Sequence, residues 1–200
     1  MAQKQLASLN FNEKEKMTKK PTNTFTDPRD GQVYKTVKIG NQVWMAQNLN
    51  YDAPGSKCNC NDQKNAEKYG RLYDWETANK VAPPGWHLPS EDEWQELVDF
   101  AGGDEVAGNK FKAKIGWKKR GNGTDEYGFS ALPGGYGKLP ETFLDVGFVG
   151  NWWCATECGA NDAWCWEMQF SVSEIAKINH YKTDLYSVRY LSLHSPFQMK

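Results

Sequence analysis

The clearest pattern of apolar and polar positions in the chain is helical and begins at Ser90. Ser90 stands three residues before Glu93, the spacing of a capping box, in which each side chain satisfies a free backbone amide of the other residue. Gly102 and Gly103 follow as residues that tolerate the left-handed conformation at a helix end. The pattern therefore predicts a helix from about Ser90 to Ala101, and its apolar stripe consists of Trp94, Leu97, Val98 and Ala101.

The segment before this helix, VAPPGWHLP, is too rich in proline to be helical. We expect Trp86, His87 and Leu88 to lie on a rigid extended segment that inserts into the core. The residues around the helix start are then architectural, and Trp44, Trp86, His87, Ser90, Glu93 and Trp94 are assigned structural roles.

Alternating positions predict strands. Residues 33–45 read as a hairpin around a Gly40-Asn41 turn. In residues 163–170, Trp164 and Trp166 fall on one strand face with Met168, so these two tryptophans should be exposed or buried together. Residues 185–193 alternate similarly, and residues 69–80 suggest a short second helix.

These elements predict an α+β domain with two short helices, a mostly antiparallel sheet and long irregular loops. Residues 52–68 are expected to form a polar loop, and residues 102–150 long irregular connections rich in glycine and lysine. The N- and C-terminal strands could pair. Residues 1–24 are polar enough to be a flexible tail or linker, so the folded domain is placed at 25–200.

Charge narrows the classes of partner. The 200 residues carry a net charge of −1, of which the first twenty residues contribute +3 and the remainder −4. This balance argues against nucleic acid as a partner. No apolar run approaches the roughly 20 residues that span a bilayer, so no membrane insertion is expected. The N-terminus also lacks an apolar signal-peptide segment.

The five cysteines are an odd number, so at least one stays unpaired if disulfides form within the chain. Their spacing matches no zinc pattern. Disulfides are favoured over free thiols, and a metal site is the third alternative. The disulfide candidates are Cys58, Cys60, Cys154, Cys158 and Cys165.

Five motifs occur in order: DGQVYKTVKIGNQVWMAQNLNY, YGRLYDWETA, PPGWHLPSEDEWQEL, NWWCATE and YSVRY. Together they resemble the Fibrobacter succinogenes major paralogous domain over about residues 25–191. The resemblance implies a secreted, periplasmic or surface-anchored protein with a C-type lectin-like fold, distantly similar to formylglycine-generating enzymes. It implies no established biochemical activity.

The chain departs from the family pattern at two positions, Ala82 and Tyr190, where the resemblance implies cysteines. If those cysteines normally form a bridge, packing of Tyr190 against Ala82 can replace a crosslink worth about 2–4 kcal/mol. We therefore expect Ala82 and Tyr190 to be neighbours, with Cβ atoms within about 8 Å.

Catalysis has little support in the sequence. The chain contains three histidines and no G-x-S-x-G, H-E-x-x-H or phosphate-binding glycine motif. No cysteine pair lies in the context that a formylglycine-generating oxidase requires. A metal-dependent enzyme is likewise not supported by any motif. A non-enzymatic role is therefore expected, and calcium is the one cofactor considered.

Calcium would require oxygen ligands in long loops. One candidate loop offers Asn122, Asp125 and Glu126, and a second offers Glu157, Asn161 and Asp162. Both are also ordinary turn compositions, and the turn interpretation is favoured.

Binding has the best physical case, because the chain holds nine tryptophans, nine tyrosines and nine phenylalanines. Exposed aromatic rings can stack on sugars or anchor a protein partner. For each aromatic residue alone, core packing is the favoured role. The function expected is a recognition or adhesion module for polysaccharide or a cell-surface protein, and an envelope scaffold is the alternative. The candidate ligand-binding residues are Tyr136, Trp153, Trp164, Tyr181 and Tyr186, with Asn161 and Asp162.

Overall fold

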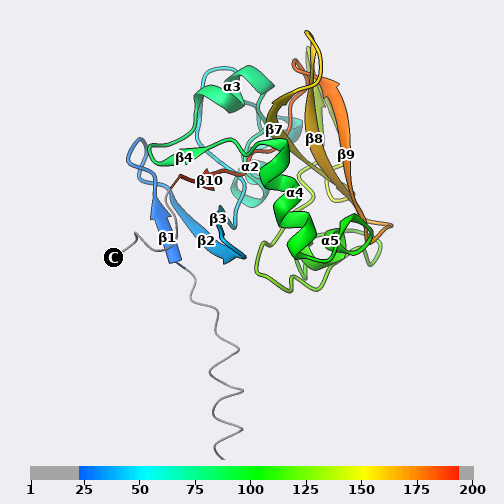
Figure 1. Cartoon of the computed structure of the whole chain (residues 1–200). Helices are drawn as coiled ribbons and strands as arrows, with labels where there is room; N and C mark the ends of the chain where they lie inside the picture. Colours follow the sequence, from blue (N-terminus) through cyan, green and yellow to red (C-terminus); the bar gives the residue numbers. More distant parts are fainter. Residues whose placement is uncertain (1–22, 194–200) are drawn as a thin grey trace, which may run out of the picture.

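The largest sheet joins the two ends of the domain. A computed structural model describes residues 23–193, and Figure 1 shows their arrangement. The sheet has the antiparallel order β1-β2-β3-β10-β4. Because β10 lies between β3 and β4, the prediction that N- and C-terminal strands pair is confirmed. The strands are β1 (Asn23–Thr26), β2 (Val33–Ile39), β3 (Gln42–Met45), β4 (Trp86–His87) and β10 (Leu191–Ser192).

Two smaller antiparallel sheets and four α-helices complete the described fold. One sheet has the order β7-β8-β9 and the other is the hairpin β5-β6. The strands are β5 (Tyr136–Lys138), β6 (Thr142–Leu144), β7 (Val149–Glu157), β8 (Asp162–Gln169) and β9 (Ile175–Tyr181). The helices are the 3₁₀ turn η1 (Asn59–Asn61), α2 (Gln63–Tyr69), α3 (Trp75–Lys80), α4 (Glu91–Phe100) and α5 (Asp104–Phe111). Within residues 23–193, no helix has the length and apolarity needed to cross a bilayer.

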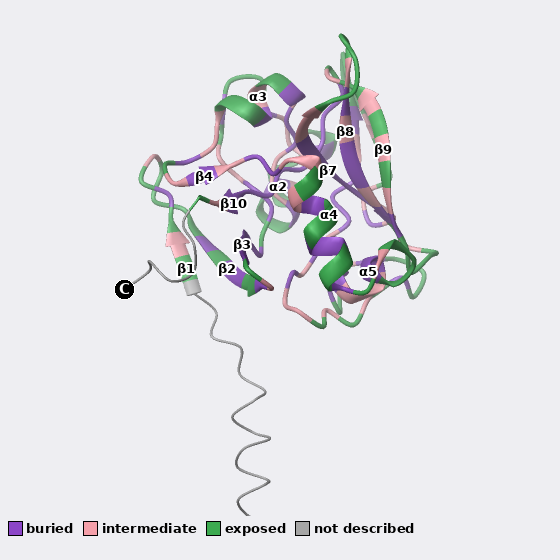
Figure 2. Cartoon of the chain, viewed as in Figure 1, coloured by how far each residue is buried: buried purple, intermediate pink, exposed green. Residues whose placement is uncertain are grey.

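The strand pair β7-β8 is buried on both faces, which divides the core in two. Trp152 and Trp166 pack on one face with Trp94 of α4, in what we call the first core. Trp153 and Cys165 pack on the other face, in the second core. Successive strand residues point to opposite faces, so nearly every residue of β7 from Gly150 to Cys154 is apolar or small. Figure 2 shows buried residues of β8 alternating with intermediate ones.

Helix α4 forms as its sequence predicts. Ser90 accepts a hydrogen bond from the backbone N–H of Glu93, and the Glu93 carboxylate accepts one from the backbone N–H of Ser90, which confirms the capping box. Trp94, Leu97 and Val98 are buried in the first core. The helix therefore fixes its start by local polar contacts and its orientation by its apolar stripe.

The number and limits of the helices differ from the prediction. The helix expected over residues 69–80 begins only at Trp75, because Asp74 caps it and the preceding Leu72 and Tyr73 pair with Lys57 and Tyr186 as isolated β-bridges. Residues 52–68 contain η1 and most of α2 instead of a plain loop. Residues 102–150 contain α5 and the β5-β6 hairpin, so that stretch is less irregular than expected.

The expected alternation over residues 185–193 is wrong. Residues 185–191 are all buried, and the regular strand in this segment is limited to β10. The segment is buried because other parts of the chain pack around it. The backbone N–H of Met45 donates a hydrogen bond to the carbonyl of Tyr190, and that of Leu49 donates one to the carbonyl of Val188. Trp164 and Trp166 were expected to be exposed or buried together, but Trp166 is buried and Trp164 is only half-buried.

The predicted domain start at residue 25 lies two residues after the beginning of β1. The basic segment within residues 1–22, and residues 194–200, lie outside the described residues.

Candidate functional site

A cleft of about 570 Å³ lies between β2, α2 and the connection 113–132. Its volume lies within the range of small-molecule sites in proteins. Apolar, amide and charged side chains share the walls. The lining residues are Gln32, Tyr34, Lys35, Thr36, Val37, Ala46, Gln47, Asn48, Asn50, Ala66, Glu67, Lys68, Tyr69, Gly70, Ala113, Lys114, Ile115, Asp125, Gly128, Ser130 and Leu132.

Asn48 is a fixed point in the wall of the cleft. Its Nδ2 donates to the carbonyl of Tyr69 at 2.8 Å and to Oγ of Ser187 at 3.3 Å. Its Oδ1 accepts from Nε1 of Trp152 and from Nε of Arg189, both at 2.8 Å. The buried amide therefore joins α2, β7 and the C-terminal segment, and it cannot rotate toward a ligand without breaking these bonds.

Arg189 lies behind this wall and is buried. Besides Asn48, its guanidinium donates to the backbone carbonyls of Phe129 and Ser130. It also packs over the Phe129 ring, 4.3 Å from the ring centroid. Burial lowers the pKa of Arg189, and only Asp125 offsets this effect. The charge is thus held mainly by neutral acceptors and not by a contacting carboxylate.

Asp125 also lines the cleft and is held by hydrogen bonds. Its carboxylate accepts hydrogen bonds from the backbone N–H and from Oγ of Ser130, both at 2.7 Å. Asp125 has a positive φ of 45°, so these two bonds hold a strained turn at the cleft rim. Three lysines from three different elements also line the cleft, namely Lys35, Lys68 and Lys114.

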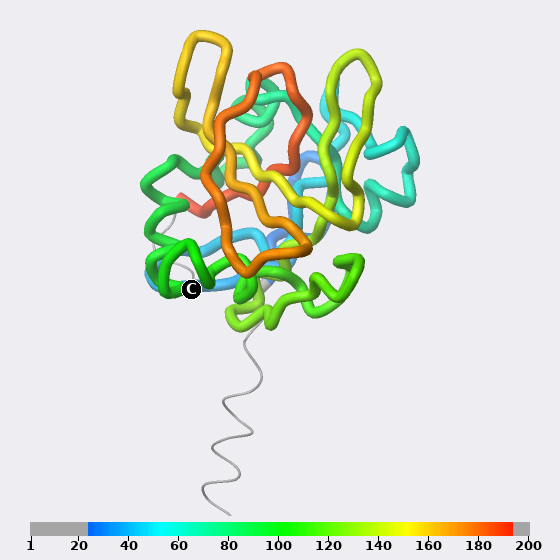
Figure 3. The backbone as a smooth tube through the Cα atoms, turned by 90° about the vertical axis from the view of Figure 1, so that its right-hand side faces the viewer, coloured from blue at the N-terminus to red at the C-terminus, as the bar shows by residue number. Residues whose placement is uncertain are grey.

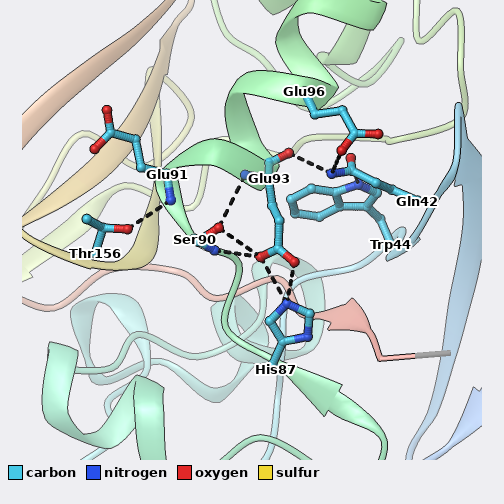
Figure 4. A network of polar contacts seen from close by, with 8 residues as sticks. All are labelled: Gln42, Trp44, His87, Ser90, Glu91, Glu93, Glu96 and Thr156. Carbon is cyan, nitrogen blue, oxygen red and sulfur yellow. Dashed lines mark hydrogen bonds and ion pairs between the residues drawn. The ribbon is translucent and has the colours of Figure 1, made fainter. Parts of the chain in front are cut away.

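A second polar network lies at the start of α4 (Figure 4). Nε2 of His87 contacts the two carboxylate oxygens of Glu93 at 2.8 and 2.9 Å. Burial alone would raise the pKa of Glu93, but hydrogen bonds from His87 and Ser90 outweigh it and lower that pKa. Oγ of Ser90 also donates to Glu93. The acceptor of this hydroxyl is a carboxylate of lowered pKa and hence a weak base, so the network is suited to holding the helix start.

Residues 37–192 match the family described as the Fibrobacter succinogenes major domain. The chain belongs to the Fibrobacter succinogenes major domain family. No curated protein and no solved structure matches the chain. The C-type lectin-like character of this family domain therefore remains a prediction, while its helices and antiparallel sheets are observed.

The residues assigned structural roles all take part in the packing of the family domain. Trp44, Trp86 and Trp94 are buried, and His87, Ser90 and Glu93 form the network at α4. At the two departures from the family pattern, Ala82 and Tyr190 both contribute to the second core. The Tyr190 hydroxyl donates to the carbonyl of Ala78 in α3. That their Cβ atoms lie within disulfide reach stays a prediction.

Two of the five aromatic candidates for ligand binding are inaccessible to a ligand. Trp153 and Tyr186 are buried against one another, with ring centroids 4.6 Å apart. The Trp153 indole N–H is taken by the carbonyl of Tyr73. The expectation that these rings form a recognition face is therefore wrong, because the second core uses them. Tyr136 packs on Tyr186 at 6.0 Å and is only half-buried.

The remaining candidates lie apart from the cleft. Tyr181 is 64% exposed and pairs with Asp162 at the end of the β8-β9 ladder. Asn161 is exposed in the turn before β8. Figure 3 shows this turn, the connection after β9 and the β5-β6 hairpin projecting at one end of the domain. Trp164 lies on the face opposite Trp153 and contacts the ammonium group of Lys177. The candidate ligand-binding residues thus lie in the second core, in the projecting loops and on the face of β8 that carries Trp164, and they do not form one site.

The calcium candidates are engaged in turn contacts. Oδ1 of Asn122 accepts from the backbone N–H of Trp117, and Asp125 bonds Ser130. Glu126 has a partner of its own. Across residues 23–193 there is no group of three or more histidine, cysteine, aspartate or glutamate side chains able to hold a metal ion. These contacts favour the turn interpretation.

All five cysteines are free thiols, so the expected disulfides are not present. Cys154 and Cys165 are neighbours along β7 and β8 but belong to different cores, because they point to opposite sheet faces. Burial raises the pKa of both thiols, which disfavours the thiolate that cysteine chemistry requires.

The cleft itself was missed by the sequence analysis. Its residues come from β2, the segment after β3, α2 and the connection after α5, and most are ordinary polar residues without motif spacing. The signals in the sequence were the long connection after α5 and Asp125, which was named there as a calcium candidate and lines the cleft.

Proposed function

We propose that this domain is a non-catalytic recognition module, secreted or held at the cell surface, with a C-type lectin-like fold and a saccharide ligand. The observation that carries the proposal is the cleft of about 570 Å³. It combines exposed polar side chains with the apolar Val37, Ile115 and Leu132. Both kinds of side chain suit a sugar ring, because its hydroxyls form hydrogen bonds and its C–H face makes apolar contacts.

The rigidity of the cleft supports binding over catalysis. Asn48 and Asp125 already have their partners, so they shape the walls without offering a free acid or base. The two buried thiols have raised pKa values, and the Ser90 hydroxyl donates to Glu93. A catalytic site needs a nucleophile or base in contact with a substrate position, and these groups do not supply one.

Binding of the full chain to a glycan array and to cellulose and xylan, with and without calcium, tests the proposal. Ile115 is 74% exposed in the cleft, and Ile115→Asp should weaken binding at least about tenfold by removing apolar contact. Val106 of α5 is 40% exposed outside the cleft, so Val106→Asp is the matched control and should leave the affinity unchanged.

Binding that survives Ile115→Asp but is lost in Tyr181→Ala would move the site to the projecting loops. The absence of any saccharide binding, with folding intact, would overturn the carbohydrate proposal and favour a protein partner or a scaffold role.

A further inference from the structure

The charges at the cleft are unevenly distributed. Lys35 comes from β2, Lys68 from the end of α2 and Lys114 from the connection after α5, and all three are exposed. Within residues 23–193, none of their ammonium groups forms an ion pair with a carboxylate. Three elements thus bring cations without a carboxylate partner to one concave site.

Arg189 adds to this field from behind the wall. It contacts Asn48 and Ser130, which both line the cleft. A charge buried in a low-dielectric interior is screened less than one in water, so its potential reaches the cleft more strongly than that of a surface residue.

The carboxylates at the cleft compensate for these cations only in part. Asp125 and Glu67 are the acidic lining residues, and Asp125 is already bonded to Ser130. The chain as a whole carries a net charge of −1. The overall charge of the protein does not attract anions. The local excess of positive charge at the cleft would therefore have to provide any preference for a negatively charged ligand.

The cleft also holds an unused acceptor. The backbone N–H of Asn50 donates to the Tyr34 hydroxyl at 3.0 Å, which fixes the residue. Its Oδ1 is buried and has no donor among the described residues. A buried acceptor without a donor costs free energy, so a ligand hydroxyl at this position would be favoured. A ligand that carries a hydroxyl donor as well as negative charge therefore fits the cleft better than a simple anion.

We propose that the cleft binds an acidic saccharide, a sugar ring that carries a carboxylate. Lys35, Lys68 and Lys114 attract the carboxylate, Asn50 accepts from a ring hydroxyl, and Ile115 and Leu132 contact the C–H face. This inference rests on the proposed recognition function and names the ligand class of that same site.

The test compares two ligands that differ in charge and otherwise only by a methyl group on the carboxyl. Calorimetric titration of the full chain uses an oligogalacturonide and its methyl ester, which keeps the rings and hydroxyls but removes the carboxylate charge. The acid should bind at least about tenfold more tightly than the ester, and this preference should fall as salt is raised.

Lysine variants locate the charge recognition. Lys68→Gln and Lys114→Gln should each weaken binding of the acid about fivefold to tenfold and leave the ester unaffected. Lys64 lies on the same helix as Lys68, is exposed and does not line the cleft. Lys64→Gln is therefore the matched control and should bind the acid like the unmodified chain.

The failures of the two proposals are distinguishable. Equal binding of acid and ester, lost in Ile115→Asp, would overturn the acidic ligand and leave the recognition function standing. Equal binding of inorganic phosphate, lost in the lysine variants, would overturn the saccharide class. If neither saccharide binds a folded chain, both proposals fail.

Discussion

Replacing Arg189 tests whether a buried cation without a contacting carboxylate stabilises the wall of the cleft. Arg189→Met removes the donors to the carbonyls of Phe129 and Ser130 and one donor to Asn48. Each buried acceptor left without a donor costs about 1–3 kcal/mol, while removal of the buried charge returns part of that cost. The expected loss in the free energy of unfolding is about 2–4 kcal/mol.

The loss should appear in urea denaturation followed by circular dichroism, and as a Tm lower by roughly 5–15 °C. The stability of Arg189→Lys should lie between that of the unmodified chain and that of Arg189→Met. An ammonium group cannot match the planar donors of a guanidinium that reach three separate acceptors. The exposed Arg120 provides the control, and Arg120→Met should change stability by less than about 0.5 kcal/mol. A Met variant as stable as the unmodified chain would refute the reasoning, since apolar packing would then outweigh the lost hydrogen bonds.

Further predictions concern packing, capping and titration. In Gly108→Ala the added Cβ would lie 2.6 Å from the carbonyl carbon of Glu174, so we expect a loss of about 2 kcal/mol or more, measured as a lower Tm. Ser90→Ala should cost about 1 kcal/mol through loss of the α4 cap, read from urea denaturation. Because the pKa of Glu93 is lowered, its stabilisation is present above its unfolded pKa and is lost as pH falls through the folded value. Glu93→Gln should therefore flatten the acid limb of the stability curve. Burial lowers the pKa of His180 more than Asp184 raises it, so NMR should find the pKa below about 6.5, and stability should decline as pH falls through that window.

Elements set by neighbours in sequence were predictable. The capping box at Ser90 and the hairpin at Gly40 depend on residues within four positions of each other, and both form as expected. Helix α5 was missed because its local signal is weak. Gly108 lies inside it, which disfavours a helix, yet Gly108 is required by the close approach of Glu174. A contact across more than sixty residues thus decides a local conformation.

The candidate site follows the same rule. The sequence suggested long loops, but not that Lys35, Lys68 and Lys114 share one cleft, because that depends on how three elements pack. Similarly, the continuous burial of residues 185–191 arises from partners such as Met45 and Leu49, which are distant in sequence. Period-two alternation identifies a strand with one exposed face, and this segment has none.

The tryptophan content shows why composition pointed to the wrong face. Many indoles connect distant segments by donating to backbone carbonyls: Trp75 to Cys154, Trp117 to Ala131 and Trp153 to Tyr73. A domain with short strands and long connections has few ladder hydrogen bonds to unite its parts, so a large rigid side chain with one donor is well suited to that role. The aromatic excess therefore accounts for the architecture. Ligand recognition is better sought among the polar residues that this architecture holds in the cleft. Within residues 23–193, the three cleft lysines have no carboxylate partner and Oδ1 of Asn50 has no donor.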